Sequence, residues 1–257
     1  MTRYATADSI AKPARLWRGA PLLAMLAAWQ LAAMTLADPM LPSPVAVVNL
    51  LAAEALHGPL LYHLAATLGR VAICFTLAMA LGTVIGFAMG ASERTNHWLD
   101  PWLQLFLNLP AMVVAILAFI WLGLGETAAI VAVTASKLPN VVVILREGTR
   151  HRSRDLAEMA RAFRFSRKAQ IVHLVLPELA PYLLAAMRSG LALVWKIVLL
   201  VELLGRSSGI GFQMHVYFQL LDITHILAYA VSFMVVMQCV DSFLLTWMER
   251  HVGRWQR

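Results

Sequence analysis

Residues 71–89 read VAICFTLAMALGTVIGFAM, a continuous run without a single charged side chain. A helix rises about 1.5 Å per residue, so a run of this length covers most of the roughly 30 Å of hydrocarbon in a bilayer. Other segments along the chain have a similar length and apolar character. The sequence therefore predicts six membrane-spanning helices, near Ala20–Ala37, Val71–Met89, Trp102–Leu122, Thr127–Leu145, Leu183–Leu204 and Ile226–Met248.

The composition of the whole chain agrees with a membrane protein. Of its 257 residues, 60% are hydrophobic and only 14% are charged, whereas soluble domains carry about 25% charged residues. The net charge of +7 would suggest nucleic acid in a soluble protein. In a membrane protein, basic residues instead collect in the loops that stay in the cytoplasm. We therefore expect a lipid membrane and no nucleic acid as the surroundings of this chain.

The positions of the basic residues predict the topology. If the N-terminus lies inside, sixteen of the 21 Lys and Arg residues fall in cytoplasmic segments, and only Arg206 falls in an outer loop. The terminal members of the inside group are Arg3, Lys12, Arg15, Arg18, Arg250, Arg254 and Arg257. Both ends of the chain are thus predicted to be cytoplasmic. We expect one transmembrane domain over residues 1–257, with a tail and first span at 1–40, an outer segment at 41–62 and five spans at 63–250.

Two local patterns outside the charged loops predict helix ends and helix contacts. Ser43 can cap a short surface helix that has Pro44 at its first position. The second span carries Gly82, Gly86 and Gly90 at intervals of four residues, a stripe that lets another helix approach closely. Flexibility near the end of the span is the alternative reading of these glycines.

The longest inside loop, residues 146–181, has a helical pattern. Its apolar stripe, Leu156, Met159, Ala160 and Phe163, follows the spacing of one helix face. Ser153 can cap this helix, and Ser166 can cap a second short helix. We expect Pro177 to end that second helix and Pro181 to begin the next span. The stripe needs a cover, which is the chain's own bundle, lipid headgroups or a cytoplasmic partner.

The loop resembles the EAA loop of the permeases of binding-protein-dependent ABC importers. Its residues Glu158-Met159-Ala160, then Arg164, then Leu174-Val-Leu176-Pro177 keep that motif's spacing. Arg164 stands where the motif has a glycine, so we expect a differently shaped turn there. A non-Gly residue in the left-handed conformation costs roughly 1–2 kcal/mol.

The resemblance extends over roughly residues 41–250 and is similar to the nitrate, sulfonate and taurine branch. It is carried by Leu41-Pro-Ser-Pro44, Gly123-Leu-Gly125-Glu126-Thr127 and Val201-Glu202-Leu203-Leu204-Gly205, followed by Ser208-Gly209-Ile210-Gly211. It implies an all-α importer permease in a bacterial inner membrane, paired with a second permease copy. Its partners would be a pair of cytoplasmic ATPases and a periplasmic binding protein that delivers a small anion.

The resemblance also implies roles for individual residues of the loop. Glu158 would make a polar contact with the ATPase, and Met159, Ala160 and Phe163 would insert into it, beside the motif positions Arg164, Leu176 and Pro177. The chain has no G-x-x-x-x-G-K-[ST] phosphate loop, and none of its four lysines follows a glycine. ATP hydrolysis is therefore assigned to a partner, and no cofactor or metal is expected.

Charged and polar residues inside the spans are candidates for a translocation path, because charge in the membrane usually faces protein or water. They are Lys137, Asn140, Trp195, Lys196 and Glu202. The alternative is a structural ion pair, for example between Lys196 and a carboxylate. Arg70 is expected to extend to the outer interface, as long basic side chains do near the ends of spans.

Two other functions compete with an ABC permease. A self-sufficient channel or secondary transporter would need no ATPase, but it should show inverted repeats or interrupted helices in matching halves, and neither is evident. A membrane enzyme would need converging catalytic residues, for which Asp222 and His225 are the only candidate pair. Capping of the last span explains that pair equally well.

Overall fold

The computed structural model describes residues 20–252, apart from the side chains of Arg154 and of residues 244–252, and all of the regular structure in this part is helical. The helices are α1 (Ala20–Leu36), α2 (Pro44–His57), α3 (Leu60–Ala91), α4 (Glu93–Asn108), α5 (Ala111–Leu122), α6 (Glu126–Arg150), α7 (Arg154–Ala162), α8 (Arg167–Gln170), α9 (Leu176–Gly205), α10 (Ile210–Gln219) and α11 (Ile223–Val252). The terminal basic residues Arg3, Lys12, Arg15, Arg18, Arg254 and Arg257 lie outside the described residues.

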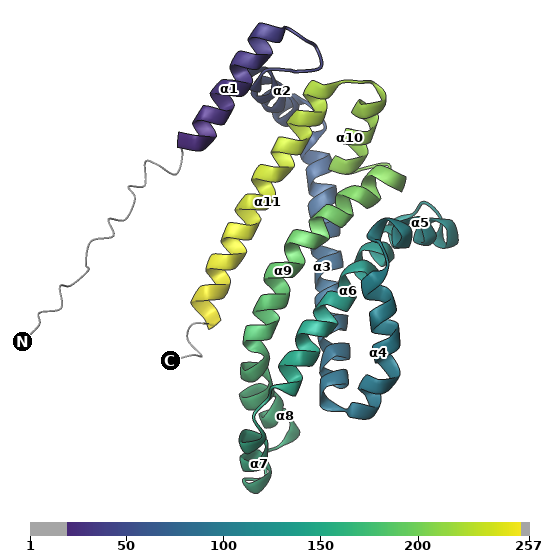
Figure 1. Ribbon diagram of the computed structural model, residues 1–257, viewed down its shortest axis with the longest axis vertical. Helices are drawn as coiled ribbons and strands as arrows, with labels where there is room; N and C mark the ends of the chain where they lie inside the picture. The colour runs from purple at the N-terminus through teal and green to yellow at the C-terminus, as the bar shows by residue number, and fades with distance from the viewer. Residues whose placement is uncertain (1–19, 253–257) are drawn as a thin grey trace, which may run out of the picture.

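The centre of the molecule is a bundle of α3, α6 and α9, which run side by side (Figure 1). Its core is made of small and branched apolar side chains that are buried, such as Val71, Ala132 and Val194. α1, α2 and α10 gather at one end of the bundle, here named the α2 end. α7 and α8 lie at the opposite end, the α7 end (Figure 1).

Four helical segments in the described chain are long and apolar enough to cross a membrane, Leu60–Ala91, Glu126–Arg150, Arg167–Gly205 and Ile223–Phe243. Three of the six predicted spans lie wholly within them, and a fourth, Ile226–Met248, overlaps the last segment and lies within α11. The first predicted span corresponds to the apolar helix α1, of which 17 residues are described.

The third predicted span, Trp102–Leu122, is wrong as one straight helix. It is divided between α4 and α5, whose axes differ by 100°. Pro110 causes the break, because proline lacks an N–H and disfavours helical backbone at the residue before it. Leu109 is accordingly extended, with φ −77° and ψ 124°. The two halves together could still form a fifth, broken span.

The glycine stripe of α3 lies along its contact with α6. A Cβ atom on Gly82 would lie 2.6 Å from Cβ of Val141, and one on Gly86 would lie 2.8 Å from Cβ of Leu145. Gly90 faces Thr149 in the same way, one turn further along. These glycines therefore let the two backbones approach more closely than any side chain would allow.

The expected helix caps are present. The hydroxyl of Ser43 accepts from the backbone N–H of Ala46, and Pro44 begins α2. Asp222 accepts from the backbone N–H of His225 at the start of α11, and its second oxygen contacts the imidazole at 2.7 Å. The Asp222–His225 pair thus caps a helix, as the capping alternative predicted.

A test of the α3–α6 contact compares two glycines of α3. Gly86→Ala should lower the free energy of unfolding by about 1–3 kcal/mol, because its methyl group would meet Leu145 and the carbonyl of Val142. A methyl group on Gly69 would have no neighbour within 4 Å, so Gly69→Ala should be neutral or stabilising by about 0.5–1 kcal/mol. Thermal unfolding in detergent measures both, and equal effects would contradict the proposed packing.

Candidate functional site: the loop at the α7 end and the charges inside the bundle

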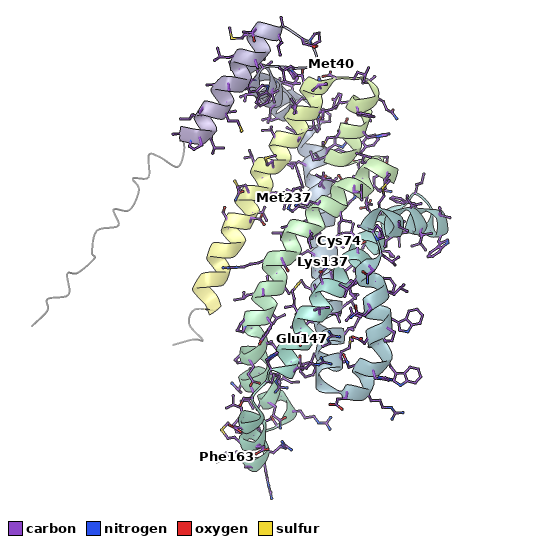
Figure 2. All side chains as sticks on the ribbon, viewed as in Figure 1. Met40, Cys74, Lys137, Glu147, Phe163 and Met237 are labelled. Atoms are coloured by element: carbon purple, nitrogen blue, oxygen red, sulfur yellow. The ribbon has the colours of Figure 1, made fainter. Side chains whose placement is uncertain are left out.

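Helix α7 protrudes from the bundle and leaves most of its apolar stripe uncovered. Ser153 caps it by accepting from the N–H of Leu156. Ala160 is buried against the molecule, with 2% of its surface exposed, whereas Phe163 is 73% exposed and Met159 is also exposed. Phe163 lies at the far tip of the α7 end (Figure 2). The side chain of Glu158 is exposed beside this stripe.

The turn that follows α7 has the left-handed geometry that a glycine normally provides. Arg164 has φ +51°. The N–H of Phe165 bonds the carbonyl of Ala160, and the N–H of Arg164 bonds that of Arg161, which together form a Schellman motif. The expectation of a differently shaped turn is therefore wrong: the arginine adopts the glycine's conformation, because the two terminal hydrogen bonds require it there.

The second helix of the loop continues without a break into the next span. Ser166 caps α8 as expected, with its hydroxyl accepting from Ala169. A π-helical segment, Ile171–Val175, then joins α8 to α9. The prediction that Pro177 ends this helix is wrong: Pro177 lies in the first turn of α9, directly after the π-helical segment, and the helix continues through it.

The end of the loop motif therefore lies inside a continuous helix. Leu176 is exposed at the first position of α9, and Pro177 is partly buried. Pro181 also lies inside α9 and does not begin a separate span.

The two lysines of the predicted path occupy different environments. Lys137 lies midway along the bundle (Figure 2), is only 1% exposed, and its Nζ atom has no hydrogen-bond partner among the described residues. It lies beneath Gly190 of α9, where a Cβ would be 3.0 Å from its Cε atom. Lys196 is exposed on α9, with its Nζ 5.4 Å from the centre of the Trp195 ring. Asn140, one turn from Lys137, is partly buried.

Glu202 lies in a buried polar cluster near the other end of the bundle. Its carboxylate is fully buried and accepts from Nη1 of Arg70 at 2.6 Å. Arg70 also donates from Nε to Glu126 at 2.6 Å, and it donates to the carbonyl and the hydroxyl of Ser208 at 2.7 Å. One guanidinium thus joins α3, α6, α9 and the loop before α10. Satisfying several acceptors in this way is what makes a buried charge tolerable.

The second oxygen of Glu202 fixes the loop between α9 and α10. It accepts from the hydroxyl of Thr67 and from the backbone N–H of Gly211, each at 2.9 Å. Gly209 has φ +114°, and a side chain there would overlap the Glu202 carboxylate. Its N–H donates to Nδ1 of His63 at 3.0 Å. The loop glycines are therefore required by the carboxylate beneath them.

These contacts correct one expectation and reveal partners that sequence reasoning missed. Arg70 does not extend to the interface, since it is buried and paired with two carboxylates. The basic partner of Glu202 is Arg70. The roles of Thr67 and His63 were not anticipated. The available signal for the pairing was opposite charge, on Arg70 directly before a predicted span and on Glu202 inside another.

A helical bundle of apolar spans, with an amphipathic helix exposed at one end and lysines inside the spans, is compatible with a membrane transport subunit. Comparisons with known proteins identify its kind. A family model described as "Binding-protein-dependent transport system inner membrane component" matches residues 78–257. The chain therefore belongs to that family, whose members are the permease subunits of ABC importers.

Individual relatives agree with this assignment. The chain is 32% identical over 216 residues to the putative aliphatic sulfonates transport permease protein SsuC of Bacillus subtilis (strain 168), covering 84% of this chain and 78% of that protein. It is 29% identical over 191 residues to the taurine transport system permease protein TauC of Escherichia coli (strain K12), covering 72% and 70%.

A solved structure shares the fold. It is titled "Crystal structure of an amino acid ABC transporter with histidines", and one of its chains matches with a TM-score of 0.60 and 18% identity, covering 75% of this chain and 93% of that chain. The protein is thus an ABC importer permease that works with ATPase and substrate-binding partners, and the alternative of a self-sufficient channel or secondary transporter is not supported.

We expect substitutions of the two carboxylates in the buried polar cluster to have unequal effects on stability. Glu202→Ala should lower the free energy of unfolding by about 3–5 kcal/mol, since it leaves one side of the buried Arg70 without its partner. Glu126→Gln should cost about 1 kcal/mol or less, because the Glu126 side chain is 46% exposed and its ion pairs are screened. Equilibrium unfolding in mixed micelles measures both changes, and an equal loss would argue against the central role of Glu202.

Proposed function

We propose that this permease conducts a small anionic solute, such as a sulfonate, into the cell by alternating access. In this proposal the chain forms a homodimer in the inner membrane of a bacterium, with six spans and with both termini in the cytoplasm. Two cytoplasmic ATPase subunits drive it, and a periplasmic binding protein delivers the solute. The main observation in support of this proposal is the uncovered apolar stripe on α7, which offers a binding surface for an ATPase.

The distribution of basic residues supports the orientation. The last turns of α6 and the connection from α6 to α9, at the α7 end, carry eight basic residues: Arg146, Arg150, Arg152, Arg154, Arg161, Arg164, Arg167 and Lys168. The α9–α10 loop at the opposite end carries one, Arg206. Basic loops remain on the cytoplasmic side, so the α7 end is assigned to the cytoplasm and the α2 end to the periplasm.

The exposure of α7 supports an ATPase as its partner. Phe163 is exposed at the tip of a loop rich in basic residues, away from the core of the bundle (Figure 2), and Met159 of α7 is also exposed. An amphipathic helix with an exposed apolar face binds by laying that face into a groove. Glu158, beside the stripe, adds a polar contact at the rim. We assign Met159, Ala160 and Phe163 to the coupling helix, and Arg164 to the turn that sets its angle.

The uncovered face of α9 supports a solute path beside a second copy. Lys196 is exposed on a helix that is long and apolar enough to cross the membrane, and Ser189 and Leu193 are exposed on the same helix. A charge that faces lipid at this depth costs roughly 2.5–3.5 kcal/mol or more. A water-filled path between two copies removes that cost and leaves the ammonium available to an anion.

The unpartnered Lys137 adds a second positive charge inside the bundle. Two lysines in the spans favour an anion as the solute, and the carboxylate of Glu202 does not oppose it, because Arg70 neutralises that carboxylate. The relatives named for aliphatic sulfonates and taurine support a solute with a sulfonate group. Trp195 and Asn140 are assigned to the lining of the path as neutral neighbours of these lysines.

The coupling role of α7 is tested by charge within its apolar stripe. Phe163→Asp should abolish co-purification of the ATPase subunits, because the exposed ring would no longer fill an apolar groove. Phe218 is also an exposed phenylalanine, but it lies on α10 at the other end of the molecule. Phe218→Asp is therefore the matched control and should retain the ATPase. Retention of the ATPase by Phe163→Asp would contradict this part of the proposal.

The path is tested at Lys196. Lys196→Met should reduce uptake of a radiolabelled alkanesulfonate into proteoliposomes by about tenfold, the effect expected if about 1.4 kcal/mol of attraction is lost. Assembly with the ATPase should be unchanged, and Lys196→Arg, which keeps the charge, should retain most of the uptake. Wild-type uptake by Lys196→Met would exclude this residue from the path.

A further inference from the structure

A polar clamp joins the start of α7 to the first turn of α9. Nε of Arg152 donates to Oε2 of Glu178 at 2.8 Å, and the backbone N–H of Ser153 donates to Oε1 of the same carboxylate at 3.0 Å. Both side chains of the ion pair are mostly buried, with 22% and 16% exposed. Ser153 is the capping residue of α7. One carboxylate therefore holds the residue that begins the protruding helix.

The clamp is attached to a rigid part of the bundle. Next to Glu178, the side chain of Leu179 is buried with Leu145 of α6 in a small apolar cluster. One turn further along α9, the ring of Tyr182 lies where a side chain on Gly148 would be, 2.5 Å from a Cβ at that position. The base of α9 is thus packed tightly on the end of α6, and Glu178 extends this contact to α7.

The segment inside the clamp is irregular. Between α7 and the clamped turn of α9, the chain passes through the left-handed Arg164 and the π-helical segment Ile171–Val175. π-helical segments have poorer regularity than an α-helix and often occur at functional positions. A force on α7 that was carried only through these residues would be partly lost as bending. The direct contact between Arg152, Ser153 and Glu178 bypasses them.

We propose that Glu178 and Arg152 are positioning residues that transmit the movement of α7 to α6 and α9. This inference rests on the proposed docking of the ATPase to α7. When the ATPase pair closes and shifts α7, the clamp makes the bases of α6 and α9 move with it. Without the clamp, α7 moves relative to the spans, and ATP is hydrolysed without transport. Glu178 and Arg152 need not touch either ATP or the solute.

The test uses charge reversal and exchange in the assembled importer, reconstituted with its ATPase and binding protein. Glu178→Arg and Arg152→Glu should each reduce the amount of solute transported per ATP hydrolysed by roughly fivefold, the range of a coupled pair in contact. The double variant, with both changes, should recover at least half of the wild-type ratio. Glu178→Asp, which keeps the charge, should remain close to wild type.

The matched control is Arg150→Glu. Arg150 is exposed at the end of α6, close to the clamp in sequence, and it contacts Glu147 of the same helix at 3.5 Å. Its reversal should leave the transport ratio unchanged. Co-purification of the ATPase is measured for every variant, because a clamp that transmits movement is needed for coupling and not for assembly.

The outcomes separate the clamp from the docking proposal. Low transport per ATP with the ATPase still bound, and recovery in the double variant, supports the clamp. If both single variants transport as much solute per ATP as the wild type, the clamp proposal is overturned. It is also overturned if those variants release the ATPase, because Arg152 and Glu178 would then belong to the docking surface. If Phe163→Asp retains the ATPase, the docking proposal fails, whatever the clamp variants do.

Discussion

The sharing of Arg70 between two carboxylates is the contact on which the bundle depends. Hydrocarbon supplies no hydrogen bonds, so every buried charge must find its partners inside the protein. Arg70 meets this requirement by bonding Glu202 of α9, Glu126 of α6 and the loop around Ser208. Three helices that are far apart in sequence are thereby fixed at the same level. The close α3–α6 packing, which the glycine stripe permits, then follows along the rest of both helices.

Much of this fold could be predicted from the sequence, because apolar run length and helix caps are local signals. The caps at Ser43 and Ser153 and the helical pattern of the long loop are confirmed. What failed depended on tertiary context. The break at Pro110 turned one expected span into two helices, while Pro177, a residue of the same type, was absorbed into a continuous helix. Both prolines lack a backbone N–H, and the difference between them lies in the chain before each one: an extended residue, Leu109, precedes Pro110, and a π-helical segment precedes the helix that contains Pro177.

The residues of the candidate site could be predicted from the sequence, but the contacts between them could not. The exposed stripe that ends at Phe163 followed from helical spacing, and the lysines were visible as charges in apolar runs. The environment of Lys137 was not, because burial under Gly190 involves helices about fifty residues apart. The same holds for Glu202, which spacing suggested as a path residue and which tertiary contacts enclose beside Arg70. Charges inside a membrane can be found from sequence, whereas their partners require the arrangement of the helices.

The unbroken helical run from Arg167 to Gly205 has a geometric consequence. Its 39 residues rise about 58 Å, nearly twice the hydrocarbon thickness of a bilayer. If the outer end of α9 lies at one membrane surface, roughly half of the run stands beyond the other. The proposed ATPase would then lie in the cytoplasm at a distance from the membrane surface, and not against the headgroups. The length of this helical run would thus determine the distance between the bilayer and the ATPase.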